Sequence, residues 1–107
     1  MIQMRPIVIE EKTFIAIQVS LPKTNLLSVH CDHGYIMCGA LDIRLLNEKL
    51  ADRGIIAGRA VGVRTIEDLL DAKLESTTTE AGKHGIVAGV TGRQALLKMM
   101  AMKRFAG

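Results

Sequence analysis

The hydrophobic period changes within the stretch Tyr35-Ile36-Met37-Cys38-Gly39-Ala40-Leu41-Asp42-Ile43-Arg44-Leu45-Leu46, where a strand pattern gives way to a helix pattern. From Asp42 onward, apolar residues recur at helical spacing, at Ile43, Leu46 and Leu50. Asp42 is a residue type that caps the N-terminus of a helix. The stretch therefore separates a β-rich region, residues 1–40, from a mixed α/β region, residues 41–107.

The β-rich region is expected to form four antiparallel strands, at residues 7–9, 13–19, 26–31 and 35–39, because β-branched and alternating segments there are separated by short polar turns. Asp32-His33-Gly34 is typical of a tight hairpin turn. In the second strand, Thr13, Ile15, Ile17 and Val19 share one face. That face is the more apolar of the two, so we expect it to be buried.

The second region combines helices with short extended segments. We expect helices at residues 43–53, 66–72 and 92–103, a helical turn at 79–84, and a strand at 55–63. Thr65 and Thr91 are suitable N-caps, and Gly54 is a suitable stop for the first helix. The sequence predicts the α+β class, with an N-terminal antiparallel β meander followed by helix-strand-helix elements in a single compact domain of residues 1–107.

Composition limits the classes of protein that need to be considered. The chain has 107 residues, of which 49% are hydrophobic and 23% charged, so one core is expected and a disordered chain is not. Aromatic residues make up only 3%, which argues against a platform for stacking nucleic-acid bases. No apolar run approaches the ~20 residues that span a bilayer. With two cysteines and no pattern of a signal peptide at the start, we expect a cytoplasmic protein with free thiols.

The formal net charge of +3 is unevenly distributed. Residues 81–107 contain five basic residues and no acidic one. A solvated helix face explains this pattern, and an acidic or phosphate-rich partner is the alternative. We do not expect nucleic acid as a partner, because the chain shows neither a dense basic patch nor a known binding motif.

Cys38 is the main candidate for chemistry. It lies between the end of a strand and the start of a helix, where a thiolate is favoured, and Gly39 would allow close approach of a ligand. His30 or His33 could act as a base for a Cys38 nucleophile. The alternative is that Cys38 packs as a small hydrophobic residue. No set of ligands has metal spacing, so no metal site is expected, and the sequence does not indicate a cofactor.

A second candidate for ligand binding is the start of the last predicted helix, Gly92-Arg93. Backbone N–H groups at a helix start, together with an arginine, can hold an anion. An ordinary capped helix start is the alternative.

The first predicted strand leaves an apolar edge, and a small chain buries only part of its surface. We therefore expect a homo-oligomer built through the N-terminal sheet.

Four blocks, at residues 34–42, 54–57, 61–70 and 89–92, together resemble the YunC-like family of small uncharacterised bacterial and archaeal proteins. The most specific block is Gly34-Tyr35-Ile36-Met37-Cys38-Gly39. The resemblance covers about residues 5–100. It implies an α+β fold and an N-terminal β region involved in tetramerisation, and it implies no known activity.

The sequence leaves three hypotheses for function. The first is a cytoplasmic homo-oligomer that binds a small anionic ligand between Cys38-Gly39 and a helix start. The second is a thiol enzyme with Cys38 as the nucleophile. The third is a structural or regulatory interaction protein.

Overall fold

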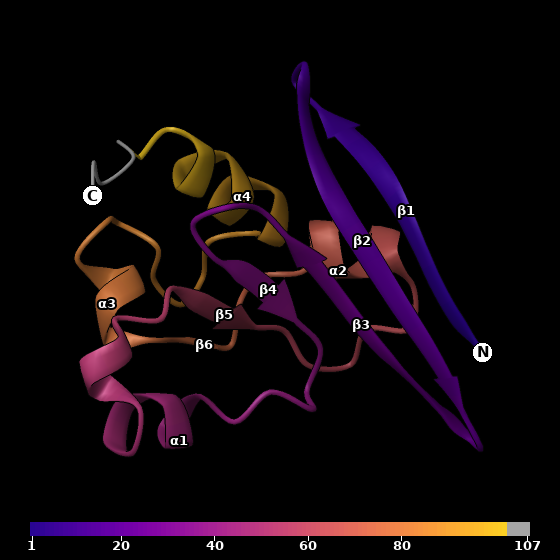
Figure 1. The fold of residues 1–107 in the computed structure, drawn as a ribbon, viewed down its shortest axis with the longest axis horizontal. Coiled ribbons are helices and arrows are strands. Elements are labelled where there is room, and N and C mark those ends of the chain that lie inside the picture. Colours follow the sequence, from indigo (N-terminus) through magenta and orange to yellow (C-terminus); the bar gives the residue numbers. More distant parts are fainter. Residues whose placement is uncertain (103–107) are drawn as a thin grey trace.

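The computed structural model describes residues 1–102, which form one six-stranded sheet and its flanking helices (Figure 1). The strands are β1 (Ile2–Ile9), β2 (Lys12–Leu21), β3 (Thr24–His30), β4 (Tyr35–Met37), β5 (Ala57–Arg59) and β6 (Ser76–Thr77). They lie side by side in chain order. All neighbouring pairs are antiparallel except β4 and β5, which are parallel.

The helices are α1 (Ile43–Glu48), α2 (Ile66–Asp71), α3 (Thr79–Gly82) and α4 (Gly92–Met100), with a short 3-10 helix at Ala51–Arg53. Side chains of Asp42, Thr65 and Thr91 cap α1, α2 and α4, as predicted. At Thr91 the cap is reciprocal, because the side chain of Gln94 also bonds the backbone of Thr91. The predicted fold class, α+β with an N-terminal antiparallel meander, is confirmed.

Several predicted boundaries were wrong. The helix predicted at residues 43–53 is divided into α1 and the 3-10 helix, after which Gly54 adopts a left-handed conformation with φ of 59°. The strand predicted at 55–63 pairs only over Ala57–Arg59. The last helix ends at Met100, and residue 103 lies outside the described residues.

The core lies between one face of the sheet, the inner face, and the helices α2 and α4. In Figure 1, α2 lies behind β2 and β3. Fully buried members of this core include Phe14, Leu27, Val29, Ile36, Leu69, Leu96 and Met99.

The opposite face, the outer face, is covered at β5 by α1. Ile43 and Leu46 of α1 and Ala57 of β5 are buried, yet they are not members of the main core cluster.

The predicted burial of β2 was wrong. Phe14 and Ala16 are each only 1% exposed, whereas Ile15 on the opposite face is 38% exposed. Ile17 and Val19 are half-buried. The reason is that α2 and α4 cover the inner face, and no helix of residues 1–102 lies in front of β1 and β2 on the outer face (Figure 1). The more apolar face of β2 is therefore left open.

No helix among the described residues is long and apolar enough to cross a bilayer.

Candidate functional site

A pocket of about 670 Å³ lies near the carboxyl ends of the parallel strands β4 and β5. After β4 the chain leaves the sheet, forms α1 and returns to β5, and ligand sites often lie where such a crossover begins. The pocket is lined by Gly39, Ala40, Leu41, Asp42, Ile43, Arg44, Asn47, Glu48, Arg59, Glu75 and Ser76.

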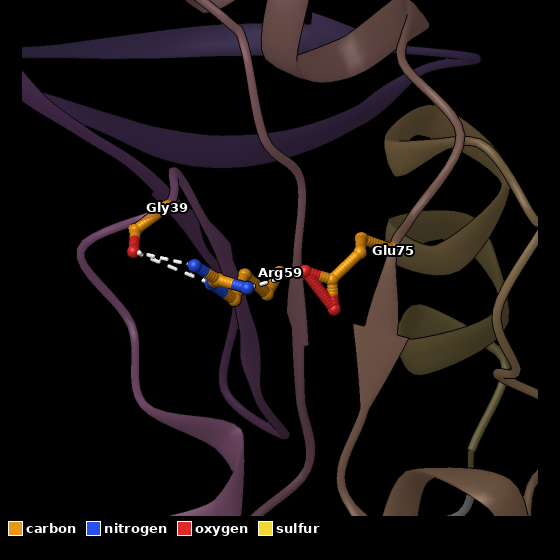
Figure 2. Close-up of polar contacts among 3 residues, drawn as sticks. All are labelled: Gly39, Arg59 and Glu75. Atoms are coloured by element: carbon orange, nitrogen blue, oxygen red, sulfur yellow. Dashed lines mark hydrogen bonds and ion pairs between the residues drawn. The ribbon is translucent and has the colours of Figure 1, made fainter.

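The guanidinium group of Arg59 lines the pocket and is held by three hydrogen bonds to Gly39 and Glu75 (Figure 2). Its Nε and Nη2 atoms both donate to the carbonyl oxygen of Gly39, at 3.3 and 3.1 Å. Its Nη1 atom donates to Oε2 of Glu75, with which Arg59 forms an ion pair. These bonds use three of the five N–H donors of the guanidinium. The Arg59 side chain is 29% exposed, so its position is fixed while part of it still faces the pocket.

The rest of the pocket carries charges of both signs. Arg44 of α1 forms an ion pair with Glu48 one turn later, at 3.1 Å. Asp42 accepts a hydrogen bond at its Oδ1 atom from the backbone N–H of Leu45, at 3.0 Å. Three carboxylates and two guanidinium groups thus surround the pocket.

Cys38 does not line this pocket, although its neighbour Gly39 does. Its side chain is 5% exposed and belongs to the main core. The Sγ atom accepts from the backbone N–H of Leu27 at 3.4 Å, and the N–H of Cys38 donates to the Leu27 carbonyl at 3.0 Å. The thiol therefore acts as a packed core group held by β3.

His30 and His33 lie together with Cys31 along a different hollow, of about 320 Å³, at the hairpin that joins β3 and β4. The Nε2 atom of His30 lies 2.8 Å from Oγ of Ser28, and its ring stacks on Tyr35 with 5.4 Å between ring centroids. Burial lowers the pKa of His30 below its ordinary value. The structure does not bring the two predicted bases into the pocket that contains Gly39.

Gly92 and Arg93 also lie away from the pocket lined by Gly39. Gly92 is buried where α4 begins, and it packs against the carbonyl oxygen of Leu69 and the side chain of Ile36. Arg93 forms an ion pair with Asp71 of α2 at 3.1 Å. Gly92 thus packs between α4 and α2, and Arg93 links the same two helices by an ion pair at the surface.

Both cysteines are free, and β3–β4 pairing places Cys38 opposite Leu27 rather than Cys31. Within residues 1–102, no group of three or more His, Cys, Asp or Glu side chains is arranged to hold a metal ion.

Arg59, Glu75 and Arg44 were not singled out by the sequence analysis. Arg59 was expected within a longer strand, and nothing local connects it with Gly39, 20 positions earlier, or with Glu75, 16 positions later. The β4–β5 register, which pairs Met37 with Arg59, brings Arg59 beside Gly39, and the β5–β6 register, which pairs Arg59 with Ser76, brings it beside Glu75.

These features define a small α+β protein with a β-α-β crossover and a charged pocket at the carboxyl ends of the two parallel strands. A family model described as a domain of unknown function, DUF1805, matches residues 37–99. The chain is 64% identical to the "Uncharacterized protein YunC" of Bacillus subtilis (strain 168) over 100 residues, which cover 94% of this chain and 99% of that protein. The chain therefore belongs to the DUF1805 family.

The fold is also similar to a crystal structure, that of a protein of unknown function, TA1206, from Thermoplasma acidophilum. The TM-score is 0.82 at 34% sequence identity, and the similarity covers 92% of this chain and 93% of the other.

Proposed function

We propose that this protein is a homo-oligomer that binds a small anionic ligand in the pocket formed by Gly39 and Arg59. One observation carries the ligand part of this proposal. The Arg59 guanidinium is fixed by Gly39 and Glu75 at the pocket wall, and two of its N–H donors are not used by those bonds.

A guanidinium that is already oriented costs little further side-chain entropy when an anion binds, and it can donate two parallel hydrogen bonds to one carboxylate. The pocket volume of about 670 Å³ falls within the range of small-molecule sites. This proposal keeps the predicted position of the ligand beside Gly39. The binding group is the Arg59 side chain rather than the Cys38 thiol, because the thiol is buried in the core.

The test is titration of the protein with propionate, followed by the backbone amide resonances of residues 39–48 and 75–76. Arg59→Gln should weaken binding by about tenfold or more, as expected for loss of a charge-assisted contact. Arg93→Gln is the matched control, since Arg93 is ion-paired with Asp71 outside the pocket. Circular dichroism verifies that both variants fold. If Arg59→Gln binds propionate as the wild type does, the assignment of the pocket is wrong.

The assembly part of the proposal rests on the outer face of β1 and β2, which we call the assembly face. It consists of Ile2, Met4, Pro6 and Val8 from β1 and Thr13, Ile15, Ile17, Val19 and Leu21 from β2. Met4 and Val8 are each 68% exposed. Gln3 and Arg5 lie on the inner side of the same strand. The N-terminal half of β1 therefore directs its apolar side chains to the outer face, away from the core.

A second copy of the chain is the partner that we propose for this face. The assembly face contains no charged residue. In a two-fold symmetric interface, where the assembly faces of two copies pack on each other, no like charges would therefore repel each other. Pro6 interrupts the row of N–H donors along the free edge of β1, which favours packing face to face over pairing edge to edge. Following the family resemblance, we expect the assembly to be a tetramer.

Light scattering coupled to size exclusion measures this directly. We expect the wild type to elute as a homo-oligomer and the Met4→Lys/Val8→Lys variant to elute as a folded monomer. Val87→Lys is the control, because Val87 is also an exposed apolar residue, at 47%, but lies outside the assembly face. A wild-type monomer at tens of micromolar would favour a different partner, and with it the hypothesis of an interaction protein.

A cytoplasmic location is part of the same proposal. It is supported by the two free thiols of Cys31 and Cys38, which are typical of proteins in a reducing compartment.

A further inference from the structure

We infer that the ligand of the Arg59 pocket is a carboxylate with an ammonium group next to it, that is, a small α-amino acid rather than a plain carboxylate or a phosphate. This inference rests on the proposed function, in which Arg59 binds an anionic group, and it identifies that group as the carboxylate of a zwitterion. The observation behind it is that Arg59 is paired with Glu75 inside the pocket.

An anion that binds the remaining donors of Arg59 must lie close to Glu75, because Glu75 accepts from the same guanidinium group at Nη1. Two carboxylates on one guanidinium repel each other. An ammonium group attached to the carbon beside the ligand carboxylate would lie between them and could donate to Glu75. The pair of Arg59 and Glu75 is thus complementary to a carboxylate and an ammonium placed side by side.

The other charges of the pocket favour the same class. Asp42 and Glu48 add two more carboxylates, whereas Arg44, the second guanidinium, is already paired with Glu48 at 3.1 Å. A phosphate with two negative charges would be opposed by three carboxylates. A zwitterion leaves the total charge of the pocket unchanged. The apolar side chains of Leu41 and Ile43 also line the pocket and offer contacts for a short aliphatic side chain.

The experiment compares three ligands of nearly equal size, alanine, lactate and propionate, by titration of the wild type and two variants. Glu75→Gln removes one of the three negative charges in the pocket, the one next to Arg59, but keeps the side chain's shape. Glu67→Gln is the matched control, since Glu67 is ion-paired with Arg5 on the surface outside the pocket. Folding of each variant is verified by its amide spectrum.

We expect the wild type to bind alanine at least about tenfold more tightly than propionate, with lactate close to propionate. In Glu75→Gln the preference should fall to about twofold, mainly through tighter binding of propionate, and Glu67→Gln should behave as the wild type does.

The outcomes separate the inference from the function on which it rests. Equal binding of alanine and propionate to the wild type, or an unchanged preference in Glu75→Gln, would overturn the inference and leave the anion site standing. Lactate that binds as tightly as alanine would also overturn it, because a hydroxyl donor would then suffice. If none of the three ligands nor inorganic phosphate binds, the proposed function fails as well.

Discussion

Gly92 at the start of α4 lies directly against the carbonyl oxygen of Leu69 in α2, so closely that a methyl group in place of its hydrogen would overlap that oxygen. The backbone N–H of Gly92 donates to the carbonyl of Ala72, at the end of the same helix α2. The two helices that cover the inner face of the sheet are thus joined by a backbone contact that only glycine allows.

Gly92→Ala should therefore lower the free energy of unfolding by about 3 kcal/mol, the upper part of the range for overpacking a tight site. The added carbon would meet backbone, which cannot move aside as a side chain can. Gly82→Ala in α3 is the control, because the same added carbon would meet open space. It should leave stability unchanged or raise it by up to about 1 kcal/mol, since alanine favours helix. Urea denaturation measures both, and equal effects would contradict the packing argument.

The turn between β1 and β2 offers a stabilising change. Glu10 and Glu11 both have positive φ, 48° and 68°, which is the conformation of a two-residue hairpin turn that favours Asn-Gly. Glu11→Gly should raise the free energy of unfolding by about 1 kcal/mol, because glycine adopts this conformation without strain. Lys12→Gly, one position later in the extended strand β2, should instead lower it. Thermal unfolding of each variant tests whether the two substitutions change the stability in opposite directions.

The pKa of His30 predicts how stability depends on pH. Burial lowers this pKa in the folded protein below the value of about 6.5 found in unfolded chains. Between the two pKa values the unfolded chain binds more protons, so the free energy of unfolding should be fully retained above about pH 6.5 and should fall as the pH decreases below it. The contribution of His30 to the free energy of unfolding is lost progressively until the pH has passed through the pKa of His30 in the folded protein.

Urea denaturation at pH 7.5 and pH 5.0 measures this loss. His30→Gln should lose less stability on acidification than the wild type does. His84→Gln, which alters an exposed histidine, should keep the wild-type difference. The assignment to His30 would be wrong if both variants behaved alike.

The two cysteines should differ in their reaction with iodoacetamide. Cys38 is 5% exposed in the core, whereas Cys31 is half-buried at the rim of a hollow beside the β3–β4 hairpin. We expect the Cys38→Ala variant, which keeps Cys31, to be alkylated at least about tenfold faster than Cys31→Ala, because reagent reaches a core thiol only when the protein opens. Faster reaction of Cys38 in the folded protein would restore the thiol-enzyme hypothesis.

Those parts of the fold that depend on local sequence could be predicted from it. Asp42, Thr65 and Thr91 cap helices through bonds to residues three positions later, and the strands of the meander follow one another through short turns. The buried face of β2 could not be predicted in the same way. Apolar content favoured Ile15 and Ile17, but burial is decided by α2 and α4, which come much later in the chain and cover the other face.

The candidate site was predicted only in part. The position of Gly39 at a strand end, next to a helix start, is visible in the sequence and does line the pocket. Arg59, to which we assign anion binding in our proposal, is positioned by the parallel pairing of β5 with β4, a long-range contact that no local pattern specifies. The strand predicted at residues 35–39 ends at Met37, so Cys38 directly follows β4, and its side chain enters the core.

The parallel pairing of β4 and β5 has a consequence for the order of folding. The hairpins of β1, β2 and β3 join near neighbours in the chain, so they can close early and at small entropic cost. Gly39, Arg59 and Glu75 come from three separate segments that meet only after the crossover through α1 has closed and β6 has added to β5. The pocket thus exists only in the completely folded chain. Any ligand that binds there therefore binds the native state and not the unfolded chain, and by mass action it raises the midpoint of thermal unfolding as its concentration increases.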